Sequence, residues 1–583
     1  MDRRGFIRSA LYFTVVSAGG PLAGCHRNHE DDPPLPDEHP LPPMGSEPFP
    51  QGVASGDPRE SSIVFWTRCP STNGAAVPLR LEVSSSDSFS SLAASVELSA
   101  TPTYDYTVRA KVTNLAPATP YFYRFVAGRI ASPVGAARTA PAASSAPQQL
   151  RFAWLSCQDW STNHWAAFSL LAREELDFVV HVGDYIYESV DLAFAPGRAE
   201  AAHTRIVLPN GDTHGGLSPG IHATSLEDYR TLYRTYRGDP RLQEVHRRFA
   251  VIAIWDDHEF ADDSWQDHET YNNSNLRDTG RRRAANQAWA EYMPVDWGDV
   301  SFDLSNPSFA NIRIFRDFRF GSLMHLVMTD ERLHRDDHVV SEMAIATLAG
   351  HDREHGDDRI GSRFFVPHSV LEDFERYDDL TLGRKPTILG EAQTDWWKAT
   401  MKGATARWKV WGNEVTLNRM WLDLRNLAPS PFNRQYVLNA DVWDGYPSHR
   451  GDLMGFLKAE GIRDVVAITG DLHAFQCGVV RDHPDPAIGT PVAVDFVSAG
   501  VSSPSFYDYV RQGTTGTPLA ALAAVPQGFD ALMREQNPDL KYADHNAQGY
   551  AVATVTADKF TVVYHKVKRL NPDGSVPLNP LAK

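Results

Sequence analysis

The sequence predicts a layered α/β fold with a small all-β domain at its N-terminal end, and three observations predict it. Short strand-like runs fill residues 49–140. Longer apolar runs recur between Phe152 and Val497, separated by helical stretches, as expected for strands that helices cover. Several of these apolar runs end in a group of polar residues, which is where α/β sheets place their ligand sites. The 583 residues are enough for more than one domain.

The first 25 residues have the pattern of an export signal. Arg3 and Arg4 precede a weakly apolar run from Ala10 to Gly24, which is shorter than the ~20 residues of a membrane span and fits a signal peptide. The arginine pair with Phe6 and Ile7 resembles a twin-arginine signal. Export by that route implies folding before export, which suits a protein that loads a metal inside the cell.

The end of this segment, Leu22-Ala23-Gly24-Cys25, resembles a bacterial lipobox. That resemblance implies cleavage before Cys25 and a lipid on its sulfur. An ordinary signal peptide with an incidental cysteine is the alternative. We therefore expect residues 1–25 to direct export by the twin-arginine machinery to the periplasm or cell surface, with membrane contact only through a lipid at Cys25.

Residues 26–48 are rich in proline, aspartate and glutamate, which predicts a disordered tether. Residues 49–140 contain Ser62–Arg68, Leu79–Val83 and Thr107–Phe125, where apolar and polar residues alternate as in half-buried strands. Short strands over this length suggest an immunoglobulin-like or fibronectin-like sandwich. The Ala, Ser and Pro content of residues 141–149 indicates a linker.

Residues 150–583 form the second predicted domain. Its expected strands are Phe152–Leu155, Phe178–Val182, Phe249–Ile254, Leu323–Met328, Trp408–Trp411, Val465–Ile468 and Val492–Val497. The segment near the C-terminus, GYAVATVTADKFTVVYHKV, predicts a hairpin that turns at Ala557–Lys559 and closes the sheet.

Composition excludes some classes of protein. The formal net charge is -17, which argues against a nucleic-acid binder because such proteins carry basic patches. The four cysteines are too few for a disulfide framework. If the substrate is anionic, arginines or metal ions must supply the local positive charge.

The polar groups after the strands offer an unusual set of metal donors: Cys157, Asp184, Tyr187, Asp257, His258, Asn413, Asp471 and His473. A thiolate and a phenolate on one ion favour a strongly polarising metal, with ferric iron the obvious candidate. Carboxylates and an amide suit a harder ion such as calcium, magnesium or manganese. Together these donors predict a site that holds two different metal ions. Each residue alone has a simpler explanation, as a core cysteine, a packed aromatic or a loop cap.

Three motifs together resemble a known family. Gly183-Asp184-x-x-Tyr187, Asp257-His258-Glu259 and Gly470-Asp471-x-His473 are similar to the calcineurin-like metallophosphatase pattern, in the form of PhoD-type alkaline phosphatases and phosphodiesterases. The opening FPQGVASGDPRESSIVFWTR is similar to the small N-terminal domain of that type. The resemblance implies a metallophosphatase sandwich, with two central mixed sheets flanked by helices.

The resemblance also implies roles for single residues. Cys157, Tyr187 and His473 would hold ferric iron, and Asp184 would bridge both metals. Asp257, Asn413 and Asp471 would hold the second metal, with calcium (one or two ions) expected and magnesium or manganese as alternatives. His258 would be the catalytic histidine, working with Asp184.

The function that follows is an exported, metal-dependent phosphoesterase. A metal-bound hydroxide would attack the phosphorus of a phosphate monoester or diester. Arg332 and Arg237 are candidates to neutralise the phosphoryl oxygens, with a structural role as the alternative for each. Two other functions stay open: a phospholipase D-like hydrolase of phospholipid headgroups on the same scaffold, and a surface-tethered binding protein without turnover.

Overall fold

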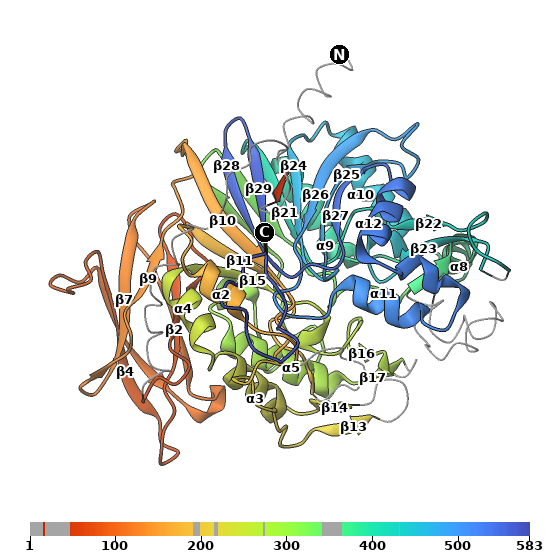
Figure 1. Cartoon of the computed structure of the whole chain (residues 1–583). Helices are drawn as coiled ribbons and strands as arrows, with labels where there is room; N and C mark the ends of the chain where they lie inside the picture. The colour runs from red at the N-terminus through yellow and green to blue at the C-terminus, as the bar shows by residue number, and fades with distance from the viewer. Residues whose placement is uncertain are drawn as a thin grey trace, which may run out of the picture.

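The computed structural model describes residues 15–17, 47–190, 199–214, 220–271, 275–340, 364–430 and 432–582. Most of the predicted export signal, including Cys25, and nearly all of the predicted tether lie outside the described residues. Two large sheets stand side by side in the middle of the molecule, with the small β domain at one end (Figure 1).

The first sheet has nine strands. Their order is β1 (Val15–Ser17), β29 (Phe560–Lys566), β28 (Gly549–Thr556), β10 (Gln149–Leu155), β11 (Phe178–Val182), β15 (Ala250–Ile254), β2 (Val53–Gly56), β3 (Ile63–Arg68) and β6 (Thr107–Val112). Strands β10, β11 and β15 are parallel, and β28 pairs antiparallel with β10. The predicted C-terminal hairpin is confirmed as β28–β29, and it does extend this sheet.

The second sheet has seven strands. Their order is β18 (Arg316–Phe320), β19 (Met324–Met328), β21 (Trp408–Asn413), β24 (Val465–Thr469), β26 (Pro491–Val497), β25 (Phe475–Arg481) and β27 (Leu540–Asp544). Strands β19, β21, β24 and β26 are parallel and the others antiparallel. All seven strands expected after residue 150 are therefore present, and the expectation of two mixed sheets is confirmed.

Apolar side chains from both sheets form one shared core. Phe152 and Phe178 of the first sheet belong to the same buried cluster as Leu326 and Ile468 of the second. Phe178 also stacks on Phe320 of β18, with 4.4 Å between ring centroids. The two sheets thus pack face to face, which explains why the inner faces of their strands are apolar.

Helices and short sheets cover the outside. The helices are α2 (Ala166–Leu171), α3 (Leu226–Tyr236), α4 (Pro240–Arg248), α5 (Thr279–Tyr292), α6 (Trp297–Val300), α8 (His368–Leu382), α9 (Gly390–Gly403), α10 (Pro447–Ala459), α11 (Phe506–Thr514) and α12 (Pro526–Gln536). The short strands are β12 (Ser189–Val190), β13 (Asp212–His214), β14 (Gly220–His222), β16 (His268–Glu269), β17 (Leu276–Arg277), β20 (Phe364–Pro367), β22 (Trp421–Asp423) and β23 (Gln435–Asn439). Helices α9 and α10 share a second apolar core with the outer face of the seven-stranded sheet.

The N-terminal domain is all-β, as predicted. Its own sheet contains β5 (Ala94–Ala100), β4 (Val77–Ser84), β7 (Pro120–Ala127) and β8 (Ile130–Ala131), with β9 (Gly135–Arg138) paired to β7. Its other strands continue the nine-stranded sheet, because Ser55 of β2 pairs with Ala250 of β15. A Cβ on Gly56 would lie 2.6 Å from the carbonyl oxygen of Val251, so the junction is tightly packed. The small domain is therefore joined to the larger one by a shared sheet as well as by the chain.

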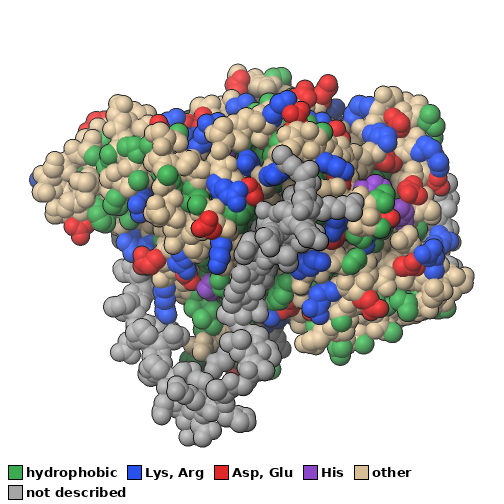
Figure 2. Space-filling view, turned by 90° about the horizontal axis from the view of Figure 1, so that it is seen from above, with side chains coloured by type: hydrophobic (Ala, Val, Ile, Leu, Met, Phe, Trp, Pro, Cys, Tyr) green, Lys and Arg blue, Asp and Glu red, His purple; other side chains and the backbone are tan. Residues whose placement is uncertain are grey.

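Blue and red side chains are intermingled on the face that Figure 2 shows, and no large patch of one sign stands out among its described atoms. Within the described ranges, no helix combines the length and the apolar character needed to cross a bilayer.

Candidate functional site

The site is built from the ends of strands in both sheets. Cys157 follows β10, Asp184 follows β11, and a short 3-10 helix, η2 (Asp257–Glu259), follows β15. Asp471 and His473 follow β24 of the other sheet. The sheets meet closely here, since a Cβ on Gly470 would lie 2.7 Å from the Oγ of Ser156. Glycine at this position thus allows the two strand ends to touch.

Four of these residues have a left-handed backbone. The φ angle is 58° at Cys157, 55° at Asp184, 55° at Asp471 and 56° at His473. Such a φ is uncommon outside glycine and is costly for a residue such as cysteine. Strained residues that the surrounding structure holds in place gather at functional sites, so the shared conformation marks these turns as a built site.

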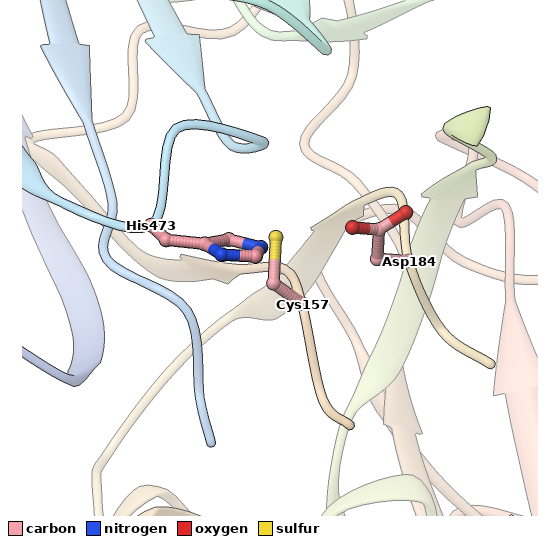
Figure 3. A group of neighbouring side chains, drawn as sticks. All are labelled: Cys157, Asp184 and His473. Carbon is pink, nitrogen blue, oxygen red and sulfur yellow. The ribbon is translucent and has the colours of Figure 1, made fainter. Parts of the chain in front are cut away.

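A first group of donors lies at the centre. The sulfur of Cys157, a carboxylate oxygen of Asp184 and a ring nitrogen of His473 lie within 4.8 Å of one another and point toward one another in Figure 3. The hydroxyl of Tyr187 donates a hydrogen bond to Asp184 Oδ2 over 3.1 Å and lies 3.2 Å from Nε2 of His473. Sulfur, phenol, imidazole and carboxylate therefore surround one small volume.

Burial makes this group unfavourable for anions. Burial, followed by the charge of Asp184, raises the pKa of the Cys157 thiol well above its usual value. Burial and the same carboxylate raise the pKa of Tyr187, and burial and the charge of Asp257 raise the pKa of Asp184. Among the described residues, Oδ1 of Asp184 has no hydrogen-bond partner. A cation would relieve all of these costs at once, so the donor set fits a metal ion.

A second group adjoins the first. Asp256, Asp257 and Asp471 offer oxygens within 4.8 Å of one another, and Asp184 and Asp257 form such a group with His258. Asp257 also forms one with Asp262 and Asp263. Asp184 belongs to the sulfur-containing group and also forms a group with Asp257 and His258, so Asp184 and Asp257 connect the sulfur-containing group to the all-oxygen group. An all-oxygen group next to a sulfur and nitrogen group suits two cations of different character.

Arg332 is enclosed by carboxylates. Its Nε lies 2.5 Å from Oδ1 of Asp256, its Nη1 lies 2.8 Å from Oδ2 of Asp441, and its Nη2 lies 3.6 Å from Oδ1 of Asp471. Nη2 is buried and has no hydrogen-bond partner among the described residues. Arg332 is itself fully buried and is not among the residues that line the pocket, so Nη2 faces the carboxylates of the second group.

His258 lies beside Asp184 and Asp257, with which it forms one of the donor groups. Its Nδ1 is 2.7 Å from Oε2 of Glu188, and its ring centroid is 4.0 Å from that of Tyr187. Burial alone would lower the pKa of His258, but the charges of Asp257, Glu188 and Asp184 raise it well above its usual value. The carboxylates around the ring therefore favour its protonated form.

Most of these side chains line one pocket that is open to solvent. Of the residues predicted for the site, Asp184, Tyr187, Asp257, His258, Asp471 and His473 line it. Cys157 is fully buried behind them.

Two predicted site residues lie elsewhere. The Nδ2 of Asn413 donates to Oγ1 of Thr469, and its Oδ1 accepts a hydrogen bond from Trp443 Nε1, so its amide connects neighbouring strand ends. The guanidinium of Arg237 lies 4.0 Å above the ring of Trp66 and donates to the carbonyl of Tyr292. Neither residue lines the pocket, and the contacts just described hold both side chains inside the fold; Arg332 and Cys157 are also buried and do not line it.

The sequence analysis also missed residues. Asp256 precedes the predicted Asp257 in WDDHE, and Glu188 follows the predicted Tyr187, so both stood next to recognised motifs. Asp441 carried no such signal, since it follows a short strand of an outer sheet.

Comparison with known proteins agrees with this geometry. Residues 152–564 match the PhoD-like phosphatase family, and residues 38–141 match the N-terminal domain of PhoD-like phosphatases. The chain is 27% identical over 581 residues to alkaline phosphatase D of Bacillus subtilis (strain 168), covering 98% of this chain and 86% of the relative. A solved structure described as the structure of PhoD superposes with a TM-score of 0.69 at 25% identity, covering 91% of this chain and 88% of that one. The chain therefore belongs to the PhoD-like phosphatase family and is a hydrolase of phosphoric esters.

Proposed function

We propose that this protein is an exported phosphoesterase that hydrolyses phosphate monoesters, diesters or both at a dinuclear site. Ferric iron would occupy the group of Cys157, Asp184, Tyr187 and His473. Calcium (one or two ions), or magnesium or manganese in its place, would occupy the group of Asp256, Asp257 and Asp471. The observation that carries the proposal is that Asp184 belongs both to the group with Cys157 and His473 and to a group with Asp257 and His258, and that Asp257 in turn belongs to the all-oxygen group with Asp256 and Asp471.

When bound, two such cations supply a hydroxide nucleophile near neutral pH and neutralise charge that develops on the phosphoryl oxygens. The residues of the chain divide the remaining work. Arg332 Nη2 lies 3.6 Å from Oδ1 of Asp471, has no hydrogen-bond partner among the described residues, and would contact a phosphoryl oxygen. His258, protonated and held by Glu188, would donate its proton from Nε2 to the leaving oxygen.

Residues 1–25 support the proposal of export. The arginine pair Arg3-Arg4 would direct the folded protein to the twin-arginine machinery, and Cys25 would carry a lipid in the periplasm or at the cell surface. Cell fractionation of the full chain beside Arg3→Lys/Arg4→Lys and Cys25→Ser variants tests both. We expect the first variant to stay inside the cell and the second to be exported but not membrane-bound.

The catalytic proposal is tested with a chromogenic phosphate monoester and a chromogenic phosphodiester, each with and without added calcium. Metal analysis of the exported protein accompanies the assays. We expect turnover of at least one ester that rises with calcium, and one iron per chain. Full turnover in a preparation free of iron and of divalent ions would contradict the proposed site.

A further inference from the structure

The pocket has two sides of opposite character. Its acidic side holds the candidate metal ligands. Its other side, which we name the apolar wall, consists of Phe364, Phe365, Leu438, Leu472, Phe506 and Val510. The proposed chemistry at phosphorus uses none of these side chains.

Two outer elements build the wall. Helix α11 turns Phe506, Tyr509 and Val510 toward the pocket, at the i, i+3, i+4 spacing that places residues on one helix face. A capping box between Ser505 and Asp508 fixes the start of this helix. This capping box holds the first turn of α11, and with it Phe506, in place beside the pocket.

The paired strands β20 and β23 supply the remainder, with Phe364 opposite Asn439 in the register. Leu472 lies between Asp471 and His473, so the wall begins directly beside the proposed metal ligands. A group attached to phosphorus would therefore reach the wall without leaving the pocket.

The wall has a buried base and two partly exposed rings. Phe365, Leu438 and Phe506 are at most 4% exposed, and they belong to the apolar core under α11 and α12. Phe364 of the wall and Tyr509 of α11 are only half-buried, and both line the pocket. Phe365 has a left-handed backbone, with φ of 53°, which is costly for an aromatic residue and is a feature of ligand clamps.

We propose that the apolar wall binds an aryl or alkyl group of the substrate, so that this enzyme prefers phosphate esters of apolar alcohols. The inference rests on the proposed phosphoesterase function and names its substrate class. A polyol would leave hydroxyl groups without partners against Phe364 and Leu472, whereas an apolar group gains by leaving water.

Two substrate series test the preference. In p-nitrophenyl alkyl phosphates, the leaving group is constant while the other alcohol grows from methyl to hexyl. In p-alkylphenyl phosphates, the leaving group keeps nearly the same acidity while its apolar tail grows. We expect kcat/KM to rise about two- to fourfold per methylene over the first carbons in at least one series. A flat profile in both series, with measurable turnover of the methyl compounds, overturns the inference and leaves the phosphoesterase function standing.

Variants locate the effect. We expect Phe364→Ala to lower kcat/KM for the hexyl ester about tenfold, mainly through KM, and to lower kcat/KM for the methyl ester by a clearly smaller factor. Phe364→Leu restores most of the loss, because it returns apolar volume without the ring. The matched control is Leu380→Ala on α8, since Leu380 is 80% exposed and does not line the pocket. Equal losses for the methyl and hexyl esters in Phe364→Ala would indicate a structural role and overturn the assignment.

Binding without turnover separates this inference from the catalytic proposal. Isothermal titration with methylphosphonate and hexylphosphonate should show tighter binding of the longer ligand, and Phe364→Ala should remove the difference. If neither ester series is turned over, the phosphoesterase proposal fails and the substrate preference fails with it. The apolar group could belong to a soluble ester or to a lipid, so phosphatidylcholine vesicles form a third arm. Vesicle turnover that depends on Phe364 assigns a lipid source, and its absence beside a rising soluble series assigns soluble esters.

Discussion

Nδ1 of His258 lies 2.7 Å from Oε2 of Glu188, and the glutamate is completely buried. Burial alone would raise the pKa of Glu188, but the charge of His258 and the hydrogen bond between them lower it to about 2. The carboxylate also accepts hydrogen bonds from Tyr271 Oη and from the amide of Asp262. Glu188 therefore fixes the orientation of the His258 ring. Nδ1 is used by the glutamate, and Nε2 is left for the substrate.

Replacing Glu188 by Gln should weaken catalysis and change its pH dependence. The pKa of His258 should fall because one of the negative charges that raise it is removed. A histidine that acts in its protonated form then loses its proton at lower pH, so the alkaline limb of the kcat profile should move to lower pH. We also expect kcat to fall about tenfold or more. Glu175→Gln, at a side chain that is 91% exposed, is the control, and an unchanged profile in Glu188→Gln would speak against this role.

Asp184→Asn should abolish turnover and reduce the metal content by at least one ion per chain. Asparagine tolerates the left-handed backbone at position 184 about as well as aspartate, so the change removes a charge with little strain. Metal analysis and kcat, measured on the same preparation, check the prediction. Asp573→Asn at an exposed position is the control. Full turnover in Asp184→Asn would show that the bridging assignment is wrong.

The proposed ferric site should give the protein a visible absorption band, because a tyrosinate bound to iron transfers charge to the metal. Tyr187→Phe should lose this band while the far-ultraviolet circular dichroism spectrum stays the same. Tyr377→Phe, at a side chain that is 61% exposed, should keep it. Persistence of the band in Tyr187→Phe would remove Tyr187 from the ligand set.

Gly470→Ala should destabilise the protein and lower its activity. The new Cβ would lie 2.7 Å from Oγ of Ser156 and 2.9 Å from Cγ2 of Val182, so the loops of the two sheets would be forced apart. Overpacking of this kind costs about 1–3 kcal/mol in the free energy of unfolding. Gly455→Ala is a matched control, because Gly455 lies within α10 with nothing within 4 Å of the new atom. Chemical denaturation should show the control to be up to ~1 kcal/mol more stable than the wild type.

A buried pair of glutamates should make the protein less stable as the pH rises. The amide of Glu414 donates to Oε2 of Glu331 over 2.7 Å, and the amide of Glu331 donates back to Glu414. Burial, followed by the charge of Glu331, raises the pKa of Glu414 well above its usual value. The unfolded chain therefore releases this proton at lower pH than the folded protein does. Stability is lost progressively above the unfolded pKa of ~4.3, up to the folded pKa.

Glu414→Gln is permanently neutral and should lessen this loss. We expect the difference in denaturation midpoint between the variant and the wild type to move in favour of the variant from pH 5 to pH 8. The control is Glu97→Gln. Glu97 is exposed on the edge strand β5 of the N-terminal domain, so this variant should show no such trend. If the difference in denaturation midpoint between Glu414→Gln and the wild type were the same at every pH, Glu414 would not be protonated in the folded protein.

The strands were predictable because their signal is local. Phe178–Val182 was expected as a strand and is observed with the same bounds. A short apolar run between polar residues favours a buried strand over other secondary structures. The joining of the small domain to the larger one was not predictable, because the pairing of β2 with β15 links residues almost 200 positions apart and neither strand signals its partner. The β domain itself was recognisable, but its shared sheet was not.

The sequence by itself determined that strand ends carry cysteine, tyrosine, histidine and aspartate, because each hydrophobic run and the motif after it lie within one short segment of the chain. Only the tertiary structure decided which polar side chains face the shared space. It brought Asp256 and Asp441 to Arg332, and it turned Asn413 and Arg237 into internal hydrogen-bonding groups. The physical reason is that donors meet through the packing of two sheets, and that packing depends on contacts such as Gly470 with Ser156 that no single segment encodes.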